Sequence, residues 1–152
     1  MLKVAIVGCG GISRSHLNSW KQIPEAKIVG ACDVRAEKYQ VFVDETGCNG
    51  YLDFSAMLRR EKPDIVDICL PTYLHADYAV KALKHGCHVL TEKPISLKMR
   101  DVDRVYSAAR RANRRVMVAQ VLRFWREYMA LADAYHTGRY GRLLSGTMLR
   151  LG

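Results

Sequence analysis

Short apolar runs alternate with helical stretches through most of the chain. Runs with the character of buried strands lie at residues 4–7, 28–32, 65–70, 87–90 and 116–120. Helical spacing fills the intervals, over residues 12–22, 35–46, 53–60, 72–85 and from residue 96 or 97 to 115. Apolar strands that alternate with helices are typical of a parallel sheet joined by right-handed crossovers. The pattern therefore predicts an α/β fold, a Rossmann doubly wound parallel sheet.

Turn and capping residues mark several of the expected boundaries. Asp53 and Thr72 are expected to cap the helices that follow them, because their side-chain oxygens can accept from free backbone N–H groups. Gly47 is expected to end the helix before it. Tyr51 and Leu52 are read as a short edge strand.

The alternation stops after Gln120. A helical stretch runs to His136, and residues 143–151 read as one strand with no later partner in the chain. A single strand is not stable alone. We therefore expect a dinucleotide-type Rossmann domain over 1–120. Residues 121–152 would then form the crossover helix and first strand of a second, α+β domain, which pairs with a partner chain or continues beyond this sequence.

A glycine-rich turn directly follows the first strand, as G-x-G-x-x-S from Gly8 to Ser13. Gly8 permits a tight turn into the next helix, and Gly10 lets the backbone approach a pyrophosphate without a Cβ in the way. The helix directs its free N–H groups toward those phosphates. Asp33 ends the second strand, where a carboxylate can accept from the adenosine ribose hydroxyls. This context favours a dinucleotide site over a purely structural strand-to-helix turn.

Composition limits the class of protein. The chain has 152 residues, of which 49% are hydrophobic and 26% charged, as in ordinary globular domains. It has no apolar run long enough for a membrane span and no signal-peptide pattern at its N-terminus. Five widely spaced cysteines without a C-x-x-C pair suit reduced, buried side chains, so we expect a cytoplasmic protein.

The net charge of +9 is concentrated in residues 98–115. On a helix, the arginines at 100, 104, 111 and 115 fall within about a 60° arc, opposite apolar positions. One interpretation is a face for nucleic acid or another anionic partner. Without interleaved aromatic residues or a nucleic-acid motif, the solvated face of an amphipathic helix is favoured.

The histidines give no metal motif. His85 and His88 are separated by a helix break at Gly86, so no metal site is expected from them. His16 is predicted on the surface of the first helix. Asp67 stands inside an apolar strand, and the sequence offers no account of it.

Three motifs occur together in order: Gly8-Cys-Gly-Gly-Ile12, Pro71-Thr-x-x-His75 and Glu92-Lys-Pro94. Together they resemble the N-terminal domain of the glucose–fructose oxidoreductase / inositol dehydrogenase (Gfo/Idh/MocA) family. Arg123-Phe124 and the stretch 138–141 resemble that family's crossover into its second domain. The resemblance covers nearly the whole chain, and the Glu-Lys-Pro step is its most specific part.

The resemblance implies roles for individual residues. Lys93 would be catalytic, assisting proton removal from a substrate hydroxyl, and would also lie at the nicotinamide end of the cofactor. Asp33 would bind the adenosine ribose, with Arg35 close by. The remaining cofactor-binding residues implied are Gly8, Gly10, Gly11, Ile12, Pro71, Thr72, His75, Glu92, Gln120 and Arg123. The cofactor would be NAD, with NADP as a possibility.

The activity implied is an NAD(P)-dependent dehydrogenase acting on a secondary hydroxyl of a sugar or cyclitol. The family's acid/base histidine, in an Asp-x-x-x-His step of the second domain, has no counterpart in this sequence. We therefore expect this chain alone to bind cofactor without turnover, and to form a homo-oligomer through its C-terminal sheet. A non-catalytic dinucleotide-binding module and, less favoured, a nucleic-acid-binding protein using helix 98–115 stay open as alternatives.

Overall fold

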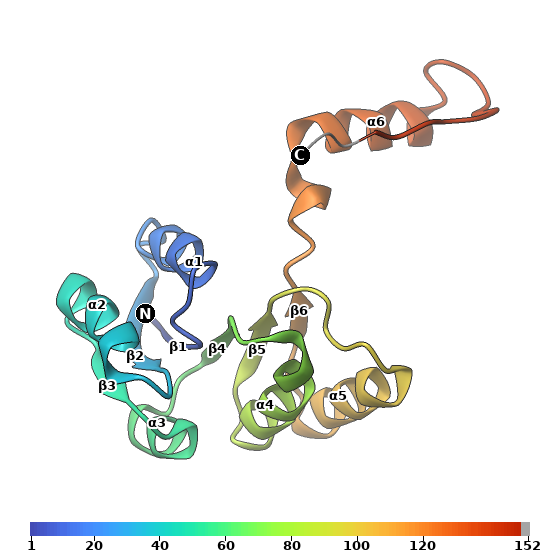
Figure 1. The fold of residues 1–152 in the computed structure, drawn as a ribbon. Coiled ribbons are helices and arrows are strands. Elements are labelled where there is room, and N and C mark those ends of the chain that lie inside the picture. Colours follow the sequence, from blue (N-terminus) through green and yellow to red (C-terminus); the bar gives the residue numbers. More distant parts are fainter. Residues whose placement is uncertain (150–152) are drawn as a thin grey trace. The chain divides into compact units, whose positions relative to one another are not determined.

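The computed structural model describes residues 1–149, which form two compact units. The first unit is Met1–Ala119, and the second begins at Gln120. The first unit holds a six-stranded sheet in the order β3-β2-β1-β4-β5-β6 (Figure 1), and every neighbouring pair is parallel. The expected doubly wound sheet is confirmed. Its strands are β1 (Leu2–Val7), β2 (Ala26–Cys32), β3 (Asn49–Tyr51), β4 (Ile65–Ile68), β5 (His88–Thr91) and β6 (Val116–Val118).

Helices cover both faces of this sheet and enclose two apolar cores. Alternate residues of β1 divide between them: Ile6 packs with Leu17 in one core, and Val7 joins Ile68 in the other. Helices α1 and α2 supply the first core and α3, α4 and α5 the second (Figure 1). Those helices are α1 (Ser13–Trp20), α2 (Ala36–Thr46), α3 (Phe54–Glu61), α4 (Thr72–Lys84) and α5 (Met99–Ala112).

The expected boundaries hold to within a few residues, with one capping error. The Asp53 carboxylate accepts from the Ala56 N–H at 2.6 Å, as predicted for the start of α3. Gly47 ends α2 in the left-handed conformation. The prediction for Thr72 was wrong: Pro71 occupies the cap position, and Thr72 is the first residue inside α4. A proline with its fixed φ sets the chain direction there without a side-chain cap.

Strands β1 and β4 lie side by side at the centre of the sheet. The chain turns from one half of the sheet to the other at this point. In open α/β sheets, ligands bind outside the carboxyl ends of the strands at such a switch in strand order. The turns after β1, β2, β4 and β5 all leave this edge, so it is where the site is built.

The second unit contains a short 3-10 turn, Val121–Phe124, and helix α6 (Arg126–Thr137). Residues 143–149 have no regular structure, so the strand expected over 143–151 is not formed there, and 150–151 lie outside the described residues. A strand needs a hydrogen-bonding neighbour, and the described part of this unit offers none. No helix of the described chain is both long and apolar enough to cross a membrane.

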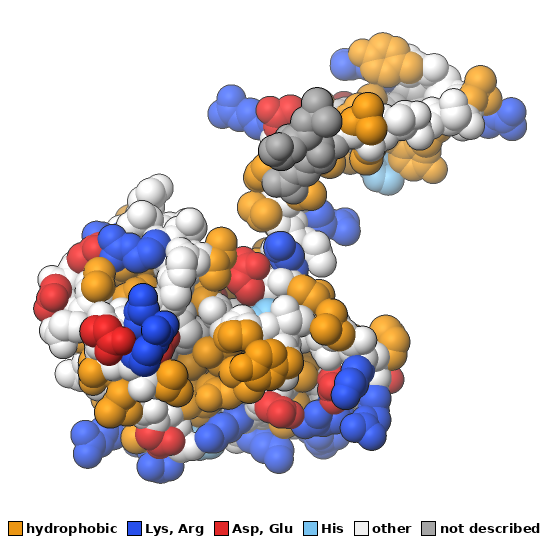
Figure 2. Space-filling view, viewed as in Figure 1, with side chains coloured by type: hydrophobic (Ala, Val, Ile, Leu, Met, Phe, Trp, Pro, Cys, Tyr) orange, Lys and Arg blue, Asp and Glu red, His pale blue; other side chains and the backbone are white. Residues whose placement is uncertain are grey.

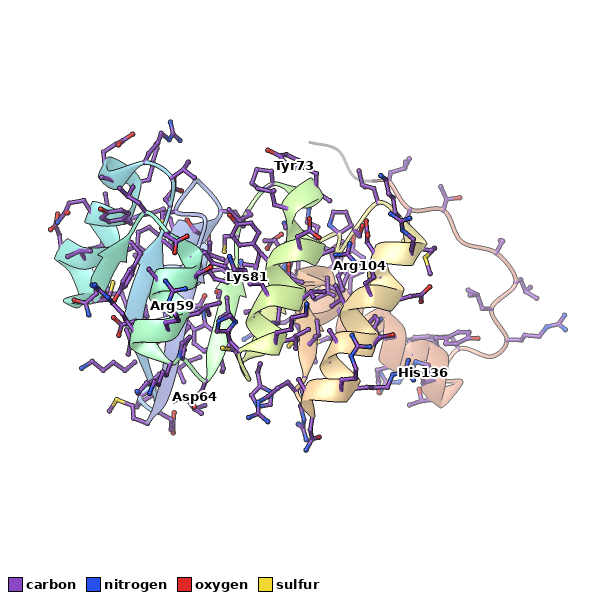
Figure 3. All side chains as sticks on the ribbon, turned by 90° about the horizontal axis from the view of Figure 1, so that it is seen from below. Arg59, Asp64, Tyr73, Lys81, Arg104 and His136 are labelled. Carbon is purple, nitrogen blue, oxygen red and sulfur yellow. The ribbon has the colours of Figure 1, made fainter. Side chains whose placement is uncertain are left out.

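Helix α5 has the amphipathic character expected. Val105, Ala108 and Ala109 are buried, and arginines lie on the opposite, exposed side. Lys and Arg side chains gather along the lower margin of the first unit in Figure 2. Figure 3 shows α3, α4 and α5 side by side across this face, with Arg104 labelled on α5. Arg104 pairs with Asp77 of α4 at 2.8 Å and with Asp101 at 2.7 Å, so part of this charge serves helix-to-helix contact.

Candidate functional site

The turn after β1 is a backbone surface that needs glycine for two different reasons. Gly8 has φ +86°, and a Cβ there would lie 2.7 Å from the carbonyl oxygen of Cys69, so no other residue fits. A Cβ on Gly10 or Gly11 would meet no atom within 4 Å. Their exposed backbone is therefore open to a ligand. The Ser13 hydroxyl donates to the Gly10 carbonyl at 2.6 Å and is fully buried, which explains a small polar residue in the third motif position.

Asp33 is tied directly to this turn. One oxygen of its carboxylate accepts from the Cys9 N–H at 2.8 Å, and the other accepts from the Arg35 N–H at 3.1 Å. The side chain is half-buried at the end of β2, and Arg35 is exposed beside it. Two backbone donors thus fix an acceptor next to the glycine turn. A carboxylate keeps lone pairs free for further donors, such as ribose hydroxyls.

The turn after β4 carries Pro71, Thr72 and His75, and the structure separates their environments. Pro71 is exposed and Thr72 half-buried, whereas His75 is 1% exposed. The His75 ring lies between two carbonyl oxygens, with Nδ1 2.8 Å from Pro94 and Nε2 2.6 Å from Leu70. It therefore ties the turn after β4 to the turn after β5.

Glu92 and Lys93 follow β5 at the same edge. The Glu92 carboxylate accepts from the Lys93 backbone N–H at 3.1 Å, and the Lys93–Pro94 peptide bond is cis. The Lys93 side chain is exposed, and within residues 1–149 its ammonium has no hydrogen-bond or ion-pair partner. An exposed cation at the carboxyl edge of the sheet is therefore open to a ligand.

His16 corrects the sequence prediction, because it is not a surface residue. Its side chain is 12% exposed, and its ring bridges two carboxylates. Nδ1 lies 2.9 Å from Asp67 in β4, and Nε2 lies 3.1 Å from Glu92. The Trp20 indole N–H also donates to Asp67, at 2.7 Å. Asp67 is fully buried, and these donors account for a carboxylate inside an apolar strand.

A helical signal for this cluster was present in the sequence. Ser13, His16, Leu17 and Trp20 recur at i, i+3, i+4 and i+7, which is the spacing of a single helix face. That face is the one α1 turns toward the sheet. The spacing could have placed His16 on the buried face of the helix, but not beside Asp67 or Glu92, which are 51 and 76 residues away.

Protonation in this cluster follows from its contacts. Hydrogen bonding to Asp67 raises the pKa of His16 to about 9, against the opposing effect of burial, with Glu92 adding to the rise. Burial raises the pKa of the Cys9 and Cys32 thiols to about 12 and also raises the pKa of Cys69. These cysteines are therefore neutral, apolar side chains rather than nucleophiles.

Donor atoms of His16, Asp67 and Cys69 lie within 4.8 Å of one another, which is a possible metal-ligand grouping. The Asp67 oxygens already accept from His16 and Trp20 at hydrogen-bond distances. Cys69 Sγ lies 3.7 Å from Asp67, and its thiol is protonated. The geometry is that of a satisfied hydrogen-bond cluster.

The residues at this edge fit a dinucleotide. Open backbone at Gly10 and Gly11 suits a diphosphate, and the fixed Asp33 carboxylate suits a ribose. Ile12 is exposed at the start of α1, beside that backbone. Gln120 and Arg123, also predicted to bind the cofactor, lie in the second unit. Their role stays a prediction.

Comparison with known proteins agrees with this geometry. The chain is 32% identical to D-apiose dehydrogenase of Paraburkholderia graminis, covering 91% of this chain and 37% of that protein. It is 27% identical to myo-inositol 2-dehydrogenase of Thermotoga maritima, covering 93% and 42%. The WlbA dehydrogenase of Bordetella pertussis, crystallised with NADH and UDP-GlcNAcA, aligns with a TM-score of 0.88 at 30% identity, covering 93% and 44%.

The chain therefore spans less than half the length of each of these relatives. Residues 2–120 match the family model GFO_IDH_MocA, described as an oxidoreductase family with an NAD-binding Rossmann fold. That match takes in β1 to β6 and, apart from Arg123, every residue predicted to bind the cofactor. The chain belongs to the Gfo/Idh/MocA oxidoreductase family and carries its NAD-binding Rossmann domain.

Proposed function

We propose that the protein is an NAD-dependent dehydrogenase that transfers a hydride between the nicotinamide and a secondary hydroxyl of a sugar or cyclitol. The observation that carries the proposal is convergence at one sheet edge. The glycine turn and Asp33 lie there with Glu92 and Lys93, contributed by the ends of three parallel strands. NADP remains a second cofactor to be tested.

The adenosine and diphosphate half of the cofactor would lie on the first of these groups. The diphosphate would face the backbone of Gly10, Gly11 and Ile12, where no Cβ blocks its approach. Asp33 would accept from the ribose hydroxyls, since its carboxylate is already oriented by Cys9 and Arg35. Pro71 and Thr72 would border the same edge, and buried His75 would hold the two neighbouring turns together.

Lys93 would act on the substrate. Its exposed ammonium can lie beside a hydroxyl, lower the pKa of that hydroxyl and assist proton removal. The bound nicotinamide supplies the hydride acceptor. Glu92 would border the nicotinamide end and, through its hydrogen bond to the Lys93 N–H, fix the backbone from which the lysine side chain extends.

The names of two relatives support the proposed substrate class. A D-apiose dehydrogenase and a myo-inositol 2-dehydrogenase are named for a sugar and a cyclitol. We infer a cytoplasmic enzyme, because the five cysteines are buried and unpaired. The second unit exposes Phe124, Leu131 and Leu144, and we infer that further sheet structure and a second copy of the chain cover them.

Calorimetric titration with NADH, followed by assays on inositols and simple sugars, tests the proposal. We expect the 152-residue chain to bind NADH and to show no turnover. A chimera with the C-terminal domain of the Thermotoga inositol dehydrogenase should reduce NAD in the presence of a polyol. Binding without turnover in every chimera would favour a non-catalytic module. Steeply salt-dependent binding to DNA, without NADH binding, would favour the nucleic-acid alternative.

A further inference from the structure

The side chains of His16, Asp67 and Glu92 form a chain of contacts across three elements. His16 lies on α1, Asp67 in the middle of β4, and Glu92 directly after β5. The ring is 2.9 Å from one carboxylate and 3.1 Å from the other. Glu92 also accepts from the backbone N–H of Lys93. Hydrogen bonds thus connect Asp67 to the backbone of Lys93 through His16 and Glu92.

The acceptors around His16 determine how many protons its ring carries. A neutral imidazole has one N–H donor, but both ring nitrogens of His16 face carboxylate oxygens. The arrangement is satisfied when the ring is an imidazolium that donates to both sides. Asp67 is the buried anchor, because Trp20 donates to it as well and Cys69 packs against it.

We propose that His16 is a positioning residue for the nicotinamide end of the site. Asp67 fixes the position of the imidazolium, which donates to the Glu92 carboxylate. Glu92 in turn accepts from the Lys93 N–H and so fixes the backbone there. The inference rests on the proposed function, since it assigns His16 a role in a site that binds NAD. It differs from a structural role in α1 packing because it requires the contact to Glu92, and not only the contact to Asp67.

Two substitutions separate these contacts. An Asn amide nitrogen occupies about the position of Nδ1, and a Gln amide nitrogen about that of Nε2. His16→Asn should therefore keep a donor toward Asp67 and lose the one toward Glu92. His16→Gln should keep the donor toward Glu92. The pair forms a matched control, since both replace the ring by a neutral amide.

The readout is the dissociation constant for ADP divided by the dissociation constant for NADH. Both are measured by calorimetry on the 152-residue chain. ADP contains the adenosine and diphosphate but no nicotinamide riboside, so the ratio isolates the nicotinamide end. We expect His16→Asn to lower this ratio about tenfold, as for loss of one hydrogen bond to a charged group, and His16→Gln to keep it within about threefold. Equal ratios in the parent and both variants would overturn the proposal.

A pH series keeps the test decisive if a variant does not fold. In the parent, the ratio should fall as the pH rises through the His16 titration, near 9. The groups facing the ring are Asp67 from β4 and Glu92 after β5, with the Cys69 thiol against Asp67 and Lys93 next to Glu92. His16→Gln retains all of these, so a fall in the parent alone identifies His16. A flat ratio in the parent would overturn the proposal.

Nitrogen NMR of the His16 ring supplies a measurement independent of the cofactor. We expect Glu92→Gln to lower the pKa of the ring, because an amide attracts an imidazolium less than a carboxylate does. An unchanged pKa would show that Glu92 does not face the cation and would overturn the inference. If the parent binds neither nucleotide, the proposed function fails and the positioning role fails with it. Binding with unchanged ratios counts against His16 alone.

Discussion

The two ends of the proposed cofactor site are built by different physical means. At the adenosine end, the site is formed mainly by backbone: an open glycine turn, and two N–H groups that orient the Asp33 carboxylate. At the nicotinamide end, side chains from α1, β4 and the turn after β5 form a charged cluster. The adenosine end requires that Gly10 and Gly11 have no Cβ atom. The nicotinamide end requires that the His16 ring is protonated, so that it donates to both carboxylates.

This difference predicts how each end fails. Added volume should disable the glycine turn at any pH, because an open backbone has no titrating group. A change of protonation should disable the cluster around His16 without altering its shape. Lys93, the residue proposed to be catalytic, extends from the second end, so the largest effect on chemistry is expected there.

Replacing Lys93 by Met tests the division between binding and chemistry. In an active chimera carrying a second domain, we expect Lys93→Met to lower kcat/KM by about 10²-fold or more, the usual contribution of a positioned proton-transfer group. The side chain is exposed, so the fold should be unaffected. Affinity for ADP should barely change. Near-normal activity in this variant would leave Lys93 without a catalytic role.

The glycine turn offers a pair of substitutions with opposite outcomes. Gly10→Val should lower NADH affinity by about 10²-fold while the unfolding transition stays in place, because its Cβ enters open space needed by the diphosphate. Gly8→Val should instead destabilise the fold, since its Cβ would collide with the Cys69 carbonyl and φ is +86°. Calorimetry and urea unfolding on both variants distinguish the two effects. Parent-like NADH binding by Gly10→Val would place the phosphates elsewhere.

The pH dependence of stability tests the charged cluster. A folded-state pKa near 9, raised from 6.5, means that the stabilisation by His16 is complete below pH 6.5 and is lost as the pH rises through 9. The shift corresponds to at most about 3 kcal/mol in the free energy of unfolding. Urea unfolding of the parent and of His16→Asn over this range measures it. The buried thiols add a similar pH dependence to both chains, so the difference between the two curves belongs to His16. Parallel curves would show that folding does not raise the pKa of His16.

Much of the first end could be predicted from the sequence, because its determinants are local. Gly8 to Ser13 directly follow β1, and Asp33 directly follows β2. Each depends on its position at a strand end, which apolar runs and glycine reveal. The second end depends on contacts across 51 and 76 residues. No local pattern specifies which helix face meets which strand, so His16 was assigned to the surface and Asp67 had no explanation.

The second unit shows another limit of local reading. Residues 143–149 read Leu-Leu-Ser-Gly-Thr-Met-Leu and are mostly apolar, but a strand exists only where a neighbour completes its hydrogen bonds. The described part contains no such neighbour for them. Helix α6 was predicted well because a helix satisfies its own backbone. The same sequence rules therefore succeed for one element and fail for the next.

Cofactor preference carries the smallest expected effect and sharpens the account of the adenosine end. The Asp33 carboxylate is held by Cys9 and Arg35 N–H groups and cannot easily turn away from a ligand. A 2′-phosphate would meet this negative charge, so NADH should bind more tightly than NADPH by roughly 1–3 kcal/mol. The exposed Arg35 side chain, weakly paired with Glu37 at 3.9 Å, can swing toward a phosphate and reduce the difference.

Asp33→Ser should reduce the difference in binding free energy between NADH and NADPH. Asp44→Ser removes a carboxylate from α2 instead and should leave that difference unchanged, which makes it the control for net charge. Calorimetric titration of the parent and both variants with NADH and NADPH gives the comparison. Equal or tighter NADPH binding by the parent would contradict the role assigned to Asp33. It would also mean that Arg35, rather than the carboxylate, dominates recognition at the adenosine end.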